Sequence, residues 1–140
     1  MFTEKTVVIT TSVSDSFPLG CKREPRSDYE IKDIIIDLNM SHIRVKNVKC
    51  CRSTGSKAKR TLARIHALPR VWQETLNLQP HYVIEVLSER FDKLDEAEKL
   101  KTLIHELLHI PASFGGGFRH HGKLVNRKKV EELYKQMKGK

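Results

Sequence analysis

The segment DEAEKLKTLIHELLHIP, residues 95–111, constrains the fold more than any other part of the chain. Asp95 is a favourable N-cap, and Glu98 three residues later completes the pattern of a capping box. Pro111 fits just past the end of such a helix. Five apolar residues recur at helical spacing along one face: Leu100, Leu103, Ile104, Leu107 and Leu108. The segment therefore predicts a long helix that is anchored in a core by its leucine-rich face.

The other face of this helix carries His105-Glu106-Leu107-Leu108-His109, the pattern HExxH. At roughly 100° per residue, the two histidines lie about 40° apart and one turn apart. Both can therefore bind one ion at the distance of about 2.0–2.1 Å that zinc requires. Glu106 points off the ligand axis, where a carboxylate can take a proton from a zinc-bound water. The pattern predicts a catalytic Zn²⁺ site, and the alternative is a helix with solvated histidines.

A catalytic zinc site needs a third protein ligand. The extended pattern HExxHxxGxxH would place histidine at position 115, where this chain has Gly115. His120 and His121 follow a glycine-rich segment that predicts a mobile loop able to return to the helix. Neighbouring side chains diverge, so only one of the two histidines is expected to ligate. Glu131 and Glu132 on a later helix are the remaining candidates.

The remaining segments predict a small sheet with helices. Residues 29–39 have helical periodicity, with Asp28 as the cap, and residues 43–50 alternate as a strand with a bulge near Asn47. Pro80 precedes a β-branched and aromatic segment that predicts a central strand at 81–88. Further elements are a strand in 61–68, a short helix in 70–77 and a last helix at 123–138. Residues 1–27 are expected to be a peripheral segment, with strand-like composition at 6–13, and residues 28–140 to form the domain.

Composition bounds the partners and the compartment. The formal net charge is +9, which favours acidic partners such as nucleic acid, although a solvated lysine-rich surface is the alternative. The cysteines Cys21, Cys50 and Cys51 show no paired spacing, which predicts free thiols in a reducing compartment. The first residues do not resemble a signal peptide, and no apolar run is long enough to cross a membrane. We therefore expect a cytoplasmic protein without a membrane partner.

The segment SERFDKLDEAEKLKTLIHELLHIPASFGGGFRHHG, with NRKKVEELYK after it, resembles the phage-type metallopeptidases of viruses and archaea. The resemblance covers about residues 28–138, and its most specific parts are HELLHIP and the arginine-x-histidine-glycine that follows. The histidine before glycine corresponds to His121, so the resemblance favours His121 over His120 as the third ligand. The histidine-glycine step is also distantly similar to the third-ligand region of SprT-like proteases. The resemblance implies an α+β, zincin-like domain: a twisted sheet of three or four strands, one backing helix and an active-site helix below.

The leading functional prediction is a zinc-dependent endopeptidase that acts on a protein or peptide. Arg119 or His120 would stabilise the oxyanion of the tetrahedral intermediate. The substrate would add as an extended strand to a sheet edge, expected at residues 43–50. A metal-dependent nuclease is one alternative, which the net charge of +9 favours. The other is a non-catalytic module that binds nucleic acid or another partner and has a structural zinc, which would normally need a fourth protein ligand.

Overall fold

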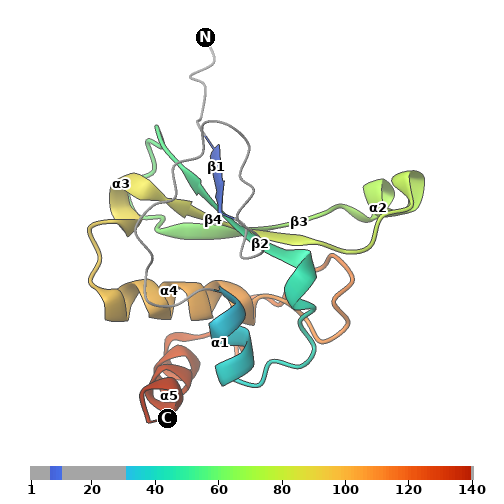
Figure 1. Cartoon of the computed structure of the whole chain (residues 1–140). Helices are drawn as coiled ribbons and strands as arrows, with labels where there is room; N and C mark the ends of the chain where they lie inside the picture. Colours follow the sequence, from blue (N-terminus) through green and yellow to red (C-terminus); the bar gives the residue numbers. More distant parts are fainter. Residues whose placement is uncertain (1–6, 11–30, 140) are drawn as a thin grey trace.

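A mixed sheet of four strands forms one layer of the fold in a computed structural model that describes residues 7–10 and 31–139 (Figure 1). The strands are β1 (Val7–Thr10), β2 (Val48–Ser53), β3 (Ala63–Ala67) and β4 (Tyr82–Leu87), in the spatial order β1-β2-β4-β3. β2 and β4 run parallel, while β1 pairs with β2 and β3 pairs with β4 in antiparallel fashion. The sheet thus has β1 and β3 as its outer strands.

β4 lies in the interior of the sheet, as its sequence predicted. One face of β4 is buried in the core: Tyr82 and Ile84 are both 0% exposed, and Val86 is 4% exposed. The register places Val48 opposite Tyr82 and Cys50 opposite Ile84, so β2 extends the same apolar face. β-branched and aromatic side chains stabilise a strand that has neighbours on both sides, because they pack against the adjacent strands. This preference explains why the prediction was confirmed.

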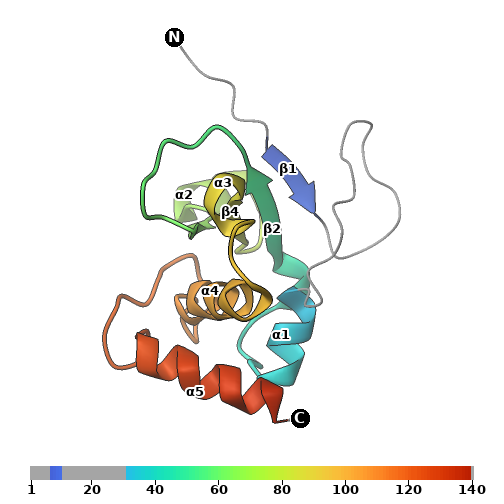
Figure 2. The ribbon, with the colours of Figure 1, turned by 90° about the vertical axis from the view of Figure 1, so that its left-hand side faces the viewer.

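The helices α1 (Ile31–Asp37), α4 (Glu96–Leu108) and α5 (Arg127–Lys138) lie below the apolar face of the sheet (Figures 1 and 2). The N-cap of α4 forms as predicted, because the Asp95 side chain accepts a hydrogen bond from the Glu98 N–H at 2.8 Å. The predicted apolar face of α4 is buried and contributes Leu100, Leu103, Ile104, Leu107 and Leu108 to the core. This arrangement confirms the predicted α+β class with an HExxH helix under a small sheet.

Two short helices complete the described part of the chain. α2 (Arg70–Leu76) lies in the connection between β3 and β4, where a short helix was predicted, and Asn77 ends it in the left-handed conformation. α3 (Ser88–Phe91) follows β4 directly and leads toward α4. Among the described residues, no helix combines the length and the apolar character needed to span a bilayer.

The prediction of an edge strand at residues 43–50 is wrong. Residues 45–47 form a 3₁₀ turn, β2 begins only at Val48, and it lies between β1 and β4 in the sheet. The turn accounts for the interruption of the apolar alternation between Val45 and Val48, which had suggested a bulge. Val48 is 2% exposed and Ile43 is 5% exposed, so the turn lets both side chains enter the core. The free edge near α4 belongs instead to β3.

Several predictions fall wholly or partly outside the described residues. Asp28, Cys21 and most of residues 1–27 belong to that part of the chain, so the proposed boundary at 27 stays a prediction. Residues 7–10, within that segment, pair with β2 as β1. Cys50 and Cys51 lie on opposite faces of β2: Cys50 packs against the core cluster, whereas Cys51 is buried outside that cluster.

Candidate metal centre

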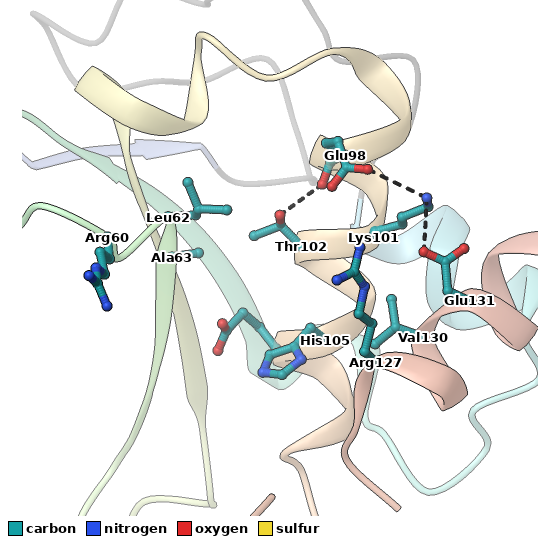
Figure 3. Close-up of a pocket in the computed structure, with 11 residues that line it drawn as sticks. Arg60, Leu62, Ala63, Glu98, Lys101, Thr102, His105, Arg127, Val130 and Glu131 are labelled. Atoms are coloured by element: carbon teal, nitrogen blue, oxygen red, sulfur yellow. Dashed lines mark hydrogen bonds and ion pairs between the residues drawn. The ribbon is translucent and has the colours of Figure 1, made fainter.

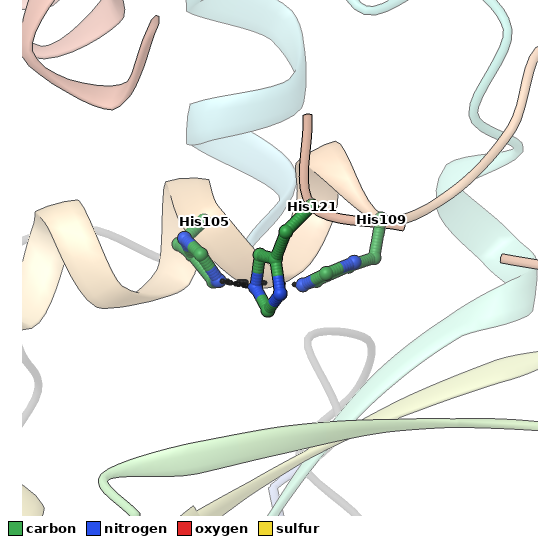
Figure 4. Close-up of side chains that lie close together, drawn as sticks. All are labelled: His105, His109 and His121. Atoms are coloured by element: carbon green, nitrogen blue, oxygen red, sulfur yellow. Dashed lines mark hydrogen bonds between the residues drawn. The ribbon is translucent and has the colours of Figure 1, made fainter. Parts of the chain in front are cut away.

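Three histidines converge between α4 and β3 (Figure 4). His105 and His109 lie one turn apart on α4, and His121 comes from the loop that follows the helix. The Nε2 atom of His105 lies 3.2 Å from Nε2 of His121 and 3.3 Å from Nε2 of His109. Two nitrogens bound to one zinc at tetrahedral angles are about 3.3–3.4 Å apart. The spacing of the cluster therefore suits a tetrahedral ion with three imidazole ligands.

The tautomer of His109 is fixed by the backbone of the loop. Its Nδ1 lies 2.6 Å from the carbonyl oxygen of Arg119. Because a carbonyl can only accept, Nδ1 carries the proton, and the lone pair of Nε2 faces the other two histidines. A hydrogen bond from the second ring nitrogen to a backbone carbonyl is the usual support of a metal-binding histidine.

The loop between α4 and the third histidine is anchored to the fold, contrary to the prediction of a mobile segment. The Arg119 N–H donates to the His109 carbonyl at 2.7 Å, so these two residues are joined by two hydrogen bonds. Phe114 in the middle of the loop is 3% exposed and belongs to the core. Beyond the loop, the Asn126 side chain donates to the Gly122 carbonyl at 2.6 Å and caps α5.

Glu106 lies on α4 beside the cluster and is only 8% exposed. No described residue makes a hydrogen bond or an ion pair to its carboxylate, so nothing within residues 7–10 and 31–139 compensates the loss of hydration. Burial raises the pKa of Glu106 to about 7. Burial, and then the neighbouring His109 and His121, lower the pKa of His105, which favours the neutral imidazole that metals bind. The site therefore combines an imidazole, His105, that favours its neutral form with a carboxyl group that can exchange a proton near neutral pH.

A cavity of about 440 Å³ opens between β3 and the cluster. Its sheet wall is made by Ala63, Arg64 and Ile65, and its other walls by the histidines, Glu106 and the end of the loop. Arg119 and His120 both line this cavity, Arg119 half-buried and His120 exposed. His120 is not one of the three histidines whose ring nitrogens converge. The structure thus brings His121 to the cluster and leaves His120 at the cavity wall.

A second pocket, of about 360 Å³, adjoins the other side of His105 and Glu106 (Figure 3). Leu62 and Val130 line it from the segment before β3 and from α5. Two arginines stand at its walls, Arg60 and Arg127, and neither forms an ion pair within the described part of the chain. Two of its acidic residues, Glu98 and Glu131, form ion pairs with the same ammonium group, that of Lys101, at 3.5 and 3.1 Å.

The fold and the cluster together define a small α+β protein whose longest helix presents an HExxH pattern to a three-histidine site. The chain belongs to the family described as putative phage metallopeptidase, whose model matches residues 22–138. Membership assigns the chain, by class, to the metallopeptidases, which are metal-dependent hydrolases. No curated protein and no solved structure showed significant similarity to it.

Proposed function

We propose that the protein is a zinc-dependent endopeptidase in which His105, His109 and His121 bind the metal. The observation that carries this proposal is the convergence of three ring nitrogens beside a buried glutamate, with Nε2 of His105 at 3.2 and 3.3 Å from the other two. Three imidazoles form a donor set that suits zinc, and they leave the fourth position of a tetrahedral ion open. A zinc ion bound there would act as a Lewis acid that lowers the pKa of a water ligand and polarises a carbonyl.

Glu106 is proposed as the general base. Its carboxyl group is buried, and its pKa of about 7 lies near the pH at which a cytoplasmic hydrolase works, as efficient proton transfer requires. The carboxylate accepts the proton of the attacking water and then donates it to the leaving amine. Arg119 and His120 line the same cavity, and we assign the stabilisation of the oxyanion to one of these two side chains.

We place the substrate on the free edge of β3. Leu68 donates to the carbonyl of His81 and Leu87 donates to the carbonyl of Leu62, so even-numbered residues of β3 are bonded to β4. The backbone groups of the odd-numbered residues Ala63, Ile65 and Ala67 therefore point away from the sheet. Because Ala63 and Ile65 also line the cavity of the metal centre, an extended peptide added to this edge would pass the three histidines.

The pocket beside His105 and Glu106 would then receive a side chain of the substrate. It lies next to the proposed general base, so the residue that it binds would be close to the scissile bond. Its apolar wall and its two arginines, Arg60 and Arg127, suit a side chain with an apolar stem and a polar or acidic end (Figure 3).

The test combines metal analysis with cleavage of a protein substrate. We expect Glu106→Ala to retain zinc and to lose at least about 10³-fold in kcat/KM, because the general base is absent. The double variant His105→Ala, His109→Ala should lose both zinc and activity. His81→Ala is the matched control, since His81 lies in the connection before β4 and its side chain bonds only to the Gln79 carbonyl among the described residues.

Four outcomes would contradict the proposal. Equal activity of the wild type and Glu106→Ala would exclude the mechanism, and zinc retained by the double histidine variant would exclude the site. Cleavage of RNA instead of protein, abolished by a chelator, would favour the metal-dependent nuclease that the net charge of +9 leaves open. A fourth protein ligand in a zinc-bound structure would favour the structural-zinc alternative.

A further inference from the structure

Tyr82 begins the central strand β4, and its side chain is 0% exposed. Its ring packs against Phe114 in the core and against Phe118, which is 40% exposed, with ring centroids 5.0 and 6.0 Å away. Both phenylalanines belong to the loop that connects α4 to His121. A tyrosine buried to this extent needs a partner for its hydroxyl group, because an unsatisfied hydroxyl in an apolar core is costly.

The partners of this hydroxyl are two peptide groups of the triple glycine. The Tyr82 hydroxyl donates to the Gly117 carbonyl at 2.8 Å and accepts from the Gly116 N–H at 2.9 Å. A single side chain from the sheet therefore satisfies a donor and an acceptor of consecutive loop residues. Such paired bonds fix the loop in position and orientation, which apolar contacts alone do not do.

Gln73 of α2 holds the same loop from a second direction. Its amide nitrogen donates to the Leu68 carbonyl at 2.8 Å and to the Gly115 carbonyl at 3.3 Å. Gly116 has a φ of +105°, and a Cβ atom there would lie 2.7 Å from the same nitrogen of Gln73. A side chain at position 116 would therefore displace the Gln73 amide from its hydrogen bonds, and the positive φ also favours glycine there.

The anchored loop leads directly into the metal centre. Arg119, two residues after Gly117, forms the pair of hydrogen bonds with His109, and His121 follows two residues later. No other described contact of Tyr82 explains a tyrosine in place of phenylalanine at this buried position. We propose that Tyr82, supported by Gln73, is a positioning residue that sets the place of His121 in the metal centre. This inference rests on the proposed function, because it assumes that His121 is a ligand.

Loss of the hydroxyl should weaken metal binding without removing a ligand. Without it, the Gly116 N–H and the Gly117 carbonyl lose their partner, and the loop samples more conformations in the metal-free protein. Binding must then order the loop again, which reduces the affinity. Because supporting groups of this kind change metal affinity by about 10–100-fold, we expect Tyr82→Phe to bind zinc about 10-fold or more weakly.

The experiment measures the zinc Kd of the full chain by competition with a chromogenic chelator and the absorption spectrum of the Co²⁺-substituted protein. Tyr82→Phe is compared with Tyr134→Phe, a tyrosine on α5 whose ring lies over Lys101. We expect a weaker Kd and an altered Co²⁺ spectrum for Tyr82→Phe only, with the circular dichroism of the metal-free protein preserved. An unchanged Kd, or an equal loss in Tyr134→Phe, would overturn the inference.

A double-mutant cycle with His121→Ala separates positioning from general stability. If Tyr82 acts through His121, Tyr82→Phe should have no further effect on the zinc Kd once His121 is absent. An equal effect in both backgrounds would overturn the inference. If His121→Ala itself leaves the zinc Kd unchanged, His121 is not a ligand and the proposed ligand set is wrong. If only Tyr82→Phe leaves the Kd unchanged, the ligand set stands and the positioning role of Tyr82 is wrong.

Gln73→Ala provides a second variant if Tyr82→Phe does not fold. Gln73 lies on the short helix α2 outside the core cluster, so its truncation leaves the packing below the sheet intact. We expect its zinc Kd to weaken several-fold, with Glu74→Ala on the same helix as the control. A Gln73→Ala protein with the Kd of the wild type would then overturn the inference.

Discussion

Glu106 shows how the environment of one residue determines its chemistry. The HExxH pattern places a carboxylate beside the metal ligands, but the pattern alone does not say whether the group is hydrated. In the fold it is 8% exposed and has no compensating donor among the described residues, which raises its pKa to about 7. The same burial that suits the group to proton transfer makes its ionisation unfavourable for the fold of the metal-free protein.

The stability of the metal-free protein should reflect this cost. The folded pKa, about 7, lies above the ordinary value of 4.5, so between these values the folded state binds more protons than the unfolded state. The contribution of Glu106 is therefore present below about pH 4.5 and is lost as pH rises through 7. At about 1.4 kcal/mol per pKa unit, we expect the unfolding free energy of the wild type to fall by about 2–3 kcal/mol relative to that of Glu106→Gln between pH 4.5 and 8.

Urea denaturation at several pH values would measure this difference. The lowered pKa of His105 has the opposite effect, because it favours the folded state as pH rises. Both proteins retain His105, so this contribution cancels when their unfolding free energies are compared. Parallel curves of unfolding free energy against pH would show that the carboxyl group is not buried as the structure has it.

At the scale of elements, the site depends on one helix and one edge strand. α4 presents His105 and His109 because its opposite face, from Leu100 to Leu108, is held in the core. β3 forms one wall of the cavity and has a free edge, because β4 takes only one of its sides. In the proposed function, α4 would orient two metal ligands and β3 would orient the substrate, and these two elements are in contact in the fold.

An N-methyl scan of a peptide substrate should reveal binding at the edge of β3. Hydrogen bonds to Ala63, Ile65 and Ala67 use alternate peptide groups of the substrate, since residues in extended chains alternate with period two. We expect methylation at every second nitrogen to lower kcat/KM about 10-fold, the effect of one lost hydrogen bond, and the intervening positions to tolerate it. Measurement of kcat/KM at each position tests this, and losses without alternation would place the substrate elsewhere.

At the scale of the whole molecule, the candidate metal centre joins α4 to the loop that follows it, in addition to the hydrogen bonds between His109 and Arg119. His121 lies 12 residues beyond His109, and the loop between them reaches up to β4 and α2 before it returns. Bound zinc would connect this loop to α4 and so stabilise the folded state by mass action, because the unfolded chain does not preserve the cluster.

Removal of zinc should therefore lower the stability of the whole domain. At free zinc 1,000-fold above Kd, the expected stabilisation is about 4 kcal/mol, which raises Tm by roughly 10 °C or more. Differential scanning calorimetry with zinc and with a chelator measures the shift. The His105→Ala, His109→Ala protein is the control and should show the same Tm in both conditions, whereas an equal shift in this variant would indicate that zinc binds elsewhere.

The sequence by itself determined α4, its cap at Asp95, the HExxH face and the interior position of β4. Each of these follows from local periodicity, from a capping residue or from the preference of β-branched side chains for a paired strand. Such signals lie within one turn or one strand, so no distant part of the chain is needed to interpret them. The α+β class follows from the same elements together with the family resemblance.

Only the tertiary structure decided which strand forms the edge, how deeply Glu106 is buried and how the glycine-rich loop is anchored. The apolar alternation at residues 43–50 indicated a strand but could not show that β1 and β4 would flank it. The glycines suggested mobility, because the conformational freedom of the glycine backbone can be recognised from the local sequence. The Tyr82 hydroxyl that holds this loop lies 34 residues from Gly116 in the sequence, so the local pattern could not reveal it. Strand order and loop anchoring depend on contacts between distant residues, and these exist only once the chain has folded.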